Sequence, residues 1–420
     1  MKNASEEIVV KITEDIRPYL IDFCKEKKFS NFLLVCDSNT YSASGRNIEK
    51  ALKECGWTVK VANLGEGEIM ADEEQIIQAM IVVEQDTDIL LAVGSGTLTD
   101  ITRFVSHRVR LPFISIPTAP SVDGFVSIGS PLVIRRLKKT IICKPPIAVF
   151  GDLEVLSHAP QKMIAAGFGD LIGKYLSVAD WKLGHLIRNE PYDEEISQKM
   201  YQTVVNCMKT IPPTSSLSKE NIKQLMEGLI QSGFCMLDFG NTSPASGAEH
   251  HISHFWEMKL IQENRPAVLH GAKVGVASII TAGWFEKINR ISKHEIAESV
   301  YQAVLPNKNL IKEEIRSVFG ENAESIIKEQ KWFLHMTPIE FQKIKERIID
   351  KWDEILEIAE QVPPPSQLTK WLQGVGAPTR PEELGLGERE TRQALEYSHY
   401  LRDRFTINKF RILFGKQIFG

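Results

Sequence analysis

The chain has 420 residues, 43% of them hydrophobic and 25% charged, with a formal net charge of -4. This balance is that of an ordinary globular protein and argues against a nucleic-acid binder, which needs a clear Lys/Arg excess. No apolar run approaches the ~20 residues that span a bilayer, and the acidic N-terminus lacks the apolar core of a secretion signal. Six scattered cysteines without CxxC spacing predict reduced thiols, so we expect a cytoplasmic protein without membrane insertion.

The first third of the chain alternates short apolar segments with segments of helical spacing. Because such strands are apolar on both faces, they predict a parallel, Rossmann-like sheet covered by helices, and residues 1–155 are interpreted as an α/β dinucleotide-binding domain. A basic, β-branched stretch at 132–142 is expected to form an antiparallel excursion. The predicted strands are 32–37, 58–63, 88–96, 112–118 and 147–152, and the predicted helices are 45–55, 72–84 and 97–105.

Residues 156–420 are predicted to form an all-helical second domain. Strand signals almost disappear, and Pro/Gly-rich loops separate the amphipathic segments. An α/β domain beside a helical one is expected to leave a ligand cleft between them. The predicted helices are 163–186, 193–209, 218–233, 246–262, 270–286, 295–303, 308–317, 321–332, 337–360 and a last one near 389–405.

Two loops that follow predicted strands are candidates for binding a phosphorylated ligand. AVGSGTLTD, residues 92–100, places glycines before a helix, whose first N–H groups suit a phosphate. It is neither GxGxxG, since Thr99 replaces the third glycine, nor a P-loop, and a simple tight turn is the alternative. SIPTAPSVDGFVS, residues 115–127, carries Asp123 among small hydroxyls, where an aspartate is also a common turn former.

Three separated segments supply a possible metal-binding set. GAEHHISHFW begins at Gly247, and its His250 and His254 are one helical turn apart. Asp170 in AAGFGDLIGK and His270 in LHGAKVGVAS lie in other predicted helices, where an ion pair with Lys174 and helix capping are the simpler interpretations. Together, Asp170, His250 and His270 offer a carboxylate and two imidazoles, which suit a divalent ion with a position open for substrate.

Taken together, these motifs resemble the sn-glycerol-1-phosphate dehydrogenase family, in particular its bacterial, arabinose-operon-associated branch. The resemblance rests on GSGTLTD, PTAPSVDGF, AAGFGDLIGK, SGAEHHISH and LHGAKVGVA, with GAPTRPEELGL and RDRFT in the tail. It covers nearly the whole chain and implies the fold shared with glycerol dehydrogenase, iron-containing alcohol dehydrogenases and dehydroquinate synthase. It also implies NAD(P), one divalent ion of zinc, nickel or iron, a small phosphorylated three-carbon substrate and a homodimer.

The resemblance also implies roles for individual residues. Asp170, His250 and His270 would hold the metal, Asp123 and Asp170 would meet the substrate, and His254 would handle protons. His251 competes with His250 for the ligand position, and His250 is favoured because the family pattern places its ligand directly after SG-small-acid. Lys139 and Arg136, in the basic stretch, are candidate phosphate partners, with a solvated strand face as the alternative. The implied cofactor-binding residues are Asp37, Gly94, Gly96, Thr97, Leu98, Thr99, Asp100, Thr118, Ala119, Pro120, Ser121 and Ser127, with Lys139 grouped beside them.

The predicted reaction is the reversible reduction of dihydroxyacetone phosphate to sn-glycerol 1-phosphate. A glycerol or polyol dehydrogenase would use the same ligands without a phosphate pocket, and a dehydroquinate-synthase-like cyclase would use NAD only transiently. The non-enzymatic alternative is an inactive nucleotide-binding regulatory protein, against which the intact Asp/His/His set argues. Activity with phosphorylated and unphosphorylated substrates separates these alternatives.

Overall fold

The computed structural model describes residues 4–135, 137–415 and 418–419, and the chain divides into two compact units. The first unit contains the residues up to Leu171 together with Val205–Gly240. The second contains Ile172–Val204 together with the residues from Asn241 onward. Two helices, α7 (Gln161–Arg188) and α8 (Glu194–Thr210), are each continuous across this division.

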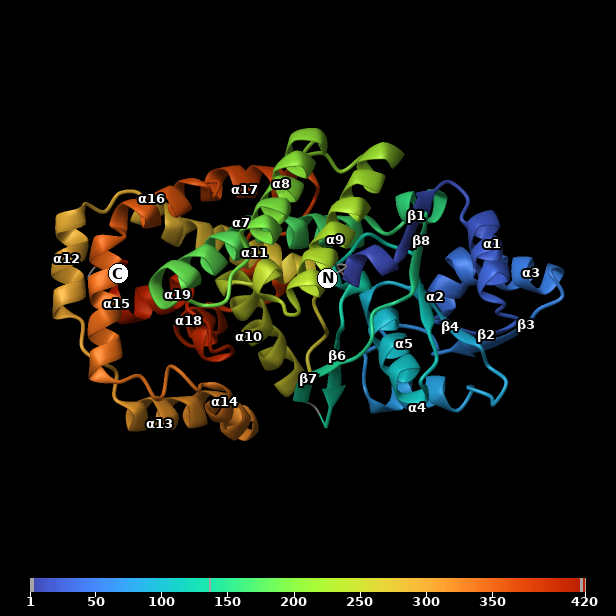
Figure 1. The fold of residues 1–420 in the computed structure, drawn as a ribbon, viewed down its shortest axis with the longest axis horizontal. Helices are drawn as coiled ribbons and strands as arrows, with labels where there is room; N and C mark the ends of the chain where they lie inside the picture. The colour runs from blue at the N-terminus through green and yellow to red at the C-terminus, as the bar shows by residue number, and fades with distance from the viewer. Residues whose placement is uncertain (1–3, 136, 416–417, 420) are drawn as a thin grey trace. The chain divides into compact units, whose positions relative to one another are not determined.

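The first unit is built on a six-stranded sheet in which every pairing is parallel (Figure 1). Its strand order is β1-β8-β5-β4-β2-β3. The predicted parallel α/β class is confirmed, and β1 is a strand that sequence reasoning missed. The strands are β1 (Val9–Thr13), β2 (Asn31–Cys36), β3 (Thr58–Asn63), β4 (Ile89–Gly94), β5 (Phe113–Pro117) and β8 (Ala148–Asp152).

Helices cover both faces of this sheet, which explains why its central strands are apolar throughout. Phe32 and Leu34 of β2 pack in the same core cluster as residues of α1 and α3, whereas Leu33 and Val35 pack with α4 and α5. This alternation is the two-residue period of a strand. The helices of the unit are α1 (Arg17–Lys27), α2 (Ser38–Thr40), α3 (Arg46–Glu54), α4 (Glu73–Met80), α5 (Gly96–Val109), α6 (Leu153–Ser157) and α9 (Lys219–Phe239).

Two features of the first unit lie outside the alternating pattern. The predicted antiparallel excursion is a two-stranded sheet of β6 (Gly129–Ile134) and β7 (Leu137–Ile142), and Arg136 lies outside the described residues. Helix α9 comes late in the sequence but packs with α6. The Ser218 capping box begins α9, and Gly240, at φ 83°, ends it.

The second unit consists of helices, and all strands described in the chain end before Leu153. The predicted helix over 337–360 is wrong as one element, because it is interrupted at Lys351 and forms α15 and α16. The helices wholly within this unit are α10 (Ala248–Gln262), α11 (His270–Ile288), α12 (Lys293–Gln302), α13 (Lys308–Phe319), α14 (Ala323–Glu329), α15 (Pro338–Asp350), α16 (Trp352–Glu360), α17 (Pro365–Gly374), α18 (Glu388–Tyr397) and α19 (Ile407–Phe414).

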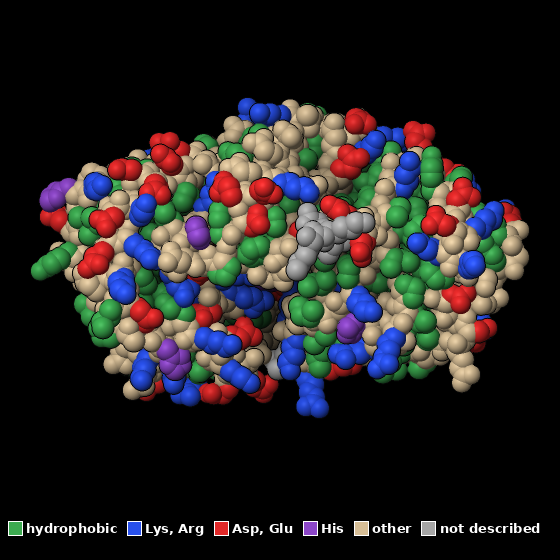
Figure 2. All heavy atoms as spheres, in the orientation of Figure 1, with side chains coloured by type: hydrophobic (Ala, Val, Ile, Leu, Met, Phe, Trp, Pro, Cys, Tyr) green, Lys and Arg blue, Asp and Glu red, His purple; other side chains and the backbone are tan. Residues whose placement is uncertain are grey.

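Charged side chains of both signs are scattered over the face shown in Figure 2, in keeping with the small net charge. Among the described helices, none is both long and apolar enough to cross a membrane.

Candidate metal centre

The glycine turn after β4 brings the N-terminus of α5 to the carboxyl edge of the sheet. A Cβ on Gly94 would lie 2.2 Å from Leu98 Cδ1, and a Cβ on Gly96 would lie 2.9 Å from Val122 Cγ2, so a side chain at either position would force its neighbour to move. Ser95, which precedes the helix, makes no side-chain cap hydrogen bond. The first amides of α5 have no partners within the helix and can therefore receive an anionic group.

In the first turns of α5, the side chains of Leu98 and Thr99 are buried, whereas those of Asp100 and Arg103 form an ion pair. The Leu98 and Thr99 side chains are buried, so only their backbone could face a cofactor. Asp100 forms an ion pair with the fully buried Arg103. Arg103 also donates to the carbonyl oxygens of Gly124 (2.5 Å) and Gly129 (2.9 Å). Arg103, which sequence reasoning missed, therefore ties the 118–127 loop to α5.

That loop is held against α7 and α9 by polar contacts at Asp123. The Asp123 N–H donates to Asp170 Oδ2 at 3.0 Å, and Ser232 Oγ of α9 donates to Asp123 Oδ2 at 2.7 Å. The backbone of α7 approaches closely, since a Cβ on Gly167 would lie only 1.7 Å from the Pro120 carbonyl oxygen. The predicted loop residues Thr118, Ala119, Pro120 and Ser121 are buried and Ser127 is half-buried. Asp123 and Asp170 are therefore brought together.

Asp170, His250 and His270 each offer a ligand atom, and these atoms all lie within 4.8 Å of one another. Asp170 stands on α7, His250 in the first turn of α10 and His270 at the first position of α11. Asp170 and His250 are buried, and the His250 and His270 ring centroids are 5.2 Å apart. A tetrahedral ion with ligands at about 2.1 Å holds its donors roughly 3.4 Å apart, a spacing within that 4.8 Å limit.

His251 has surroundings that differ from those of His250. His250 Nδ1 lies 2.7 Å from Glu249 Oε1. His251 is 1% exposed, and within the described parts of the chain neither of its ring nitrogens has a hydrogen-bond partner. Burial, together with the positive charge of Arg404, holds the pKa of His251 well below its usual value, so this imidazole is neutral.

His254 belongs to a second group of side chains beside the first. Its Nδ1 lies 3.4 Å from Glu257 Oε2, and Glu257 Oε1 lies 3.6 Å from the ammonium nitrogen of buried Lys273. His254, Glu257 and His270 form a further trio whose ligand atoms lie within 4.8 Å of one another. Glu257 and Lys273 were missed from the sequence, although their spacing from His254 and His270 is that of helical neighbours.

The remaining predicted residues lie elsewhere. Asp37 directly follows β2 and caps α2 by accepting the Thr40 N–H at 2.7 Å, so it lies at the carboxyl edge of the sheet. Lys139 is exposed on β7, opposite Leu132.

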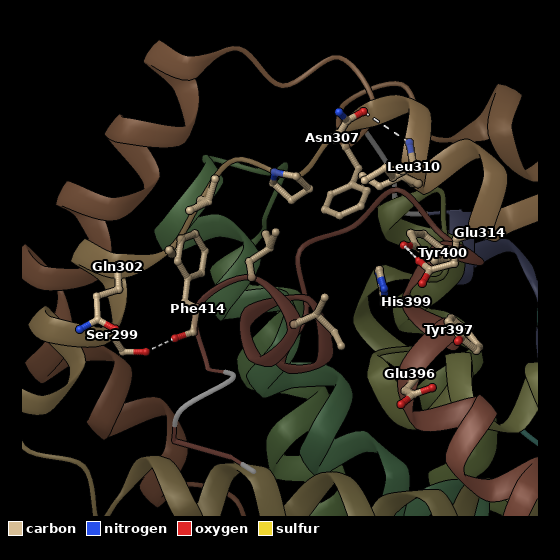
Figure 3. A pocket seen from close by; sticks show the side chains of 17 residues that line it. Ser299, Gln302, Asn307, Leu310, Glu314, Glu396, Tyr397, His399, Tyr400 and Phe414 are labelled. Atoms are coloured by element: carbon tan, nitrogen blue, oxygen red, sulfur yellow. Dashed lines mark hydrogen bonds between the residues drawn. The ribbon is translucent and has the colours of Figure 1, made fainter.

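The second unit also contains a cavity of about 650 Å³, shown in Figure 3, whose lining residues include none of those predicted for the site. Tyr400 and Glu314 are hydrogen-bonded in its wall, and His399 also lines it. The cavity is therefore separate from the metal-binding set.

Comparison with known proteins defines the class of this fold and site. Residues 11–160 match the family model for iron-containing alcohol dehydrogenase. The structure is similar to that of the alcohol dehydrogenase from Oenococcus oeni, with a TM-score of 0.61 and 12% identity, covering 95% of this chain and 94% of that one. The fold is therefore the one found in iron-containing alcohol dehydrogenases.

Closer relatives narrow the class to a family. A glycerol-1-phosphate dehydrogenase (NAD(P)+) from Geobacillus thermodenitrificans is 37% identical, and the match covers 97% of this chain and 91% of the relative. One from Geobacillus stearothermophilus is 36% identical over 94% of this chain and 88% of the relative. The chain belongs to the glycerol-1-phosphate dehydrogenase family, a family of NAD(P)-dependent oxidoreductases. The resemblance inferred from the sequence motifs is confirmed.

Proposed function

We propose that the chain is a metal-dependent enzyme that reversibly reduces dihydroxyacetone phosphate to sn-glycerol 1-phosphate with NAD(P)H. The observation that carries the proposal is the convergence of Asp170, His250 and His270 within 4.8 Å. One carboxylate and two imidazoles form a donor set suited to zinc, nickel or iron(II). The names of the close relatives support a phosphorylated three-carbon substrate.

In the reducing direction, dihydroxyacetone phosphate, NAD(P)H and a proton give sn-glycerol 1-phosphate and NAD(P)+. When bound, the nicotinamide supplies the hydride and the divalent ion supplies Lewis-acid stabilisation of negative charge on the carbonyl oxygen. The protein must then position the carbonyl carbon, hold the ligand carboxylate and deliver the proton.

Asp123 and Asp170 perform the positioning. The bond from the Asp123 N–H to Asp170 Oδ2 orients the carboxylate that is proposed to bind the ion. Ser232 Oγ donates to Asp123 Oδ2 and so holds the carboxylate that is proposed to accept a hydrogen bond from a substrate hydroxyl. Both carboxylates are thus held by protein contacts before substrate arrives, which lowers the entropy cost of the reaction.

We assign to His254 the transfer of the proton to and from the substrate oxygen. Glu257 Oε2 faces its Nδ1, so a proton on Nδ1 is held by the carboxylate and Nε2 can exchange the other proton with the substrate oxygen. Lys273 offsets the charge of Glu257 on the opposite side. This arrangement explains the crowded histidines: His250 is a metal ligand, His254 a proton donor and His251 a packed neutral residue.

We propose that the first unit binds the NAD(P) cofactor. The pyrophosphate is placed at the N-terminus of α5, with the 118–127 loop beside it, and Asp37 is placed to accept hydrogen bonds from the adenosine ribose. A carboxylate there favours NAD by repelling the 2′-phosphate of NADP. From the family resemblance, the enzyme is further proposed to be a cytoplasmic homodimer.

The test is the oxidation of NADH, followed by absorbance, with dihydroxyacetone phosphate and with unphosphorylated dihydroxyacetone. We expect turnover with the phosphorylated substrate, its loss after chelation and its recovery on adding zinc or nickel. Turnover with dihydroxyacetone alone would replace this proposal by a polyol dehydrogenase. If a preparation shown by elemental analysis to contain no metal kept full activity, the proposed role of the metal would be refuted.

A further inference from the structure

The carboxylate of Glu249 is buried at the start of α10, where it touches His250. Glu249 is 0% exposed, and its Oε1 both lies 2.7 Å from His250 Nδ1 and accepts the Gly247 N–H at 2.8 Å. Burying a charged group is costly unless it is hydrogen-bonded. Its position in the first turn of a 15-residue helix further stabilises a negative charge.

The local backbone is adapted to this carboxylate. A Cβ on Gly247 would lie 2.8 Å from Glu249 Oε2 and 2.6 Å from Asp180 Oδ2, so a side chain there would displace both acids. Asp180 accepts the N–H groups of Ala248 at 2.7 Å and Ile407 at 2.6 Å. Two buried acids therefore support the same helix start, and Glu249 also contacts His250, a histidine of the metal-binding set.

We propose that Glu249 is the positioning residue for the metal centre: it accepts a hydrogen bond from His250 Nδ1 and thereby presents His250 Nε2 to the ion. The inference rests on the proposed function, in which His250 is a ligand. A carboxylate at the far nitrogen fixes the ring tautomer and orientation, and strengthens the near nitrogen as an electron-pair donor. Glu249 directly precedes His250 in the sequence, and both lie in the first turn of α10. The backbone at the start of the helix therefore fixes the positions of both side chains.

The alternative is that Glu249 serves only to cap α10 through the Gly247 N–H. Asp180→Asn is a matched control for that purely structural role, because it also replaces a buried acid that accepts backbone N–H groups at this helix start. Glu249→Gln keeps the size and an accepting oxygen but removes the charge. A purely structural role predicts that both variants lose thermal stability and that their metal affinities change to the same extent or not at all.

The experiment measures zinc affinity by competition with a chromophoric chelator, and the visible spectrum of the cobalt(II)-loaded protein, for the full-length chain. We expect Glu249→Gln to bind zinc 10–100-fold more weakly and to shift the cobalt spectrum, as is typical when such a partner is lost. Asp180→Asn should stay within about threefold of wild type. Folding of each metal-free variant is checked by circular dichroism. Glu249→Asp replaces Glu249→Gln, and Asp180→Glu replaces Asp180→Asn, if the first variant does not fold.

Two outcomes keep this inference distinct from the proposed function. If His250→Ala abolishes zinc binding but Glu249→Gln binds as wild type does, the positioning role is refuted and the metal site stands. If wild type binds no zinc, or His250→Ala binds it unchanged, the proposed metal site itself is wrong. An equal loss of affinity in Glu249→Gln and Asp180→Asn would also refute the positioning role, because it would reflect the helix start alone.

Discussion

Replacing Gly167 by alanine tests whether the loop that carries Asp123 must lie directly against α7. The added Cβ would sit 1.7 Å from the Pro120 carbonyl oxygen, whereas real Cβ contacts are essentially never shorter than 3.0 Å. The loop and the helix must therefore separate by about 1.3 Å, and both partners are backbone, so no rotamer change can absorb the contact. The hydrogen bond from the Asp123 N–H to Asp170, now 3.0 Å long, would be lost.

The expected effects follow from that displacement. Overpacking of this kind costs about 1–3 kcal/mol of stability. A misplacement near 1 Å costs roughly 100-fold in rate when it moves groups that position the substrate. The assays are urea unfolding and kcat/KM for dihydroxyacetone phosphate.

Gly124→Ala is the matched control for this substitution. It lies in the same loop, but its Cβ would meet nothing within 4 Å. The control should behave as wild type. If Gly167→Ala keeps kcat/KM within twofold of the Gly124→Ala control, the close approach does not position the site and the reasoning is refuted.

Three further substitutions test separate parts of the structure. His250→Ala should lose the bound divalent ion while His251→Ala keeps it, as counted by elemental analysis; the reverse result would reassign the ligand. Ser232→Ala removes the donor to Asp123 Oδ2 and should lower stability by about 1–3 kcal/mol together with kcat/KM; unchanged kinetics would show that this bond does not orient Asp123. His399 is buried with its pKa held well below 6.5, so the unfolded chain takes up the proton first and stability falls as pH drops below about 6.5. His399→Phe should reduce that loss by up to about 1.4 kcal/mol per pH unit, measured by urea unfolding at pH 7 and 5.5, and an unchanged pH dependence would contradict it.

Much of the sheet could be predicted from the sequence because its central strands are buried on both faces. FLLVCD and ILLAVG are apolar without interruption, and they form β2 and β4 as expected. Strand β1 was missed because an edge strand is only partly buried, and Val9 is in fact exposed. The break at Lys351 was missed because the apolar spacing continues from α15 into α16, which hides a local loss of helical geometry.

In the candidate site, too, some residues could be predicted from the sequence and others could not. Three local motifs suggested Asp170, His250 and His270 as a carboxylate and two imidazoles suited to a divalent ion, and the family resemblance favoured His250 over His251. The identity of their supporting partners depends on tertiary packing. Ser232 is 109 residues from Asp123 in the chain, and nothing in its own neighbourhood marks it. Glu249, by contrast, stood beside His250 in the sequence, but its burial and its contact with Nδ1 could only come from the structure.

The buried guanidinium of Arg103 has a consequence for the energetics of ligand capture. Arg103 hydrogen-bonds α5 to the carbonyl oxygens of Gly124 and Gly129. The two segments expected to bind the dinucleotide are therefore held together before it binds. A coenzyme that binds there does not have to order a flexible loop. Less conformational entropy is therefore lost on binding, and more of the contact energy contributes to affinity.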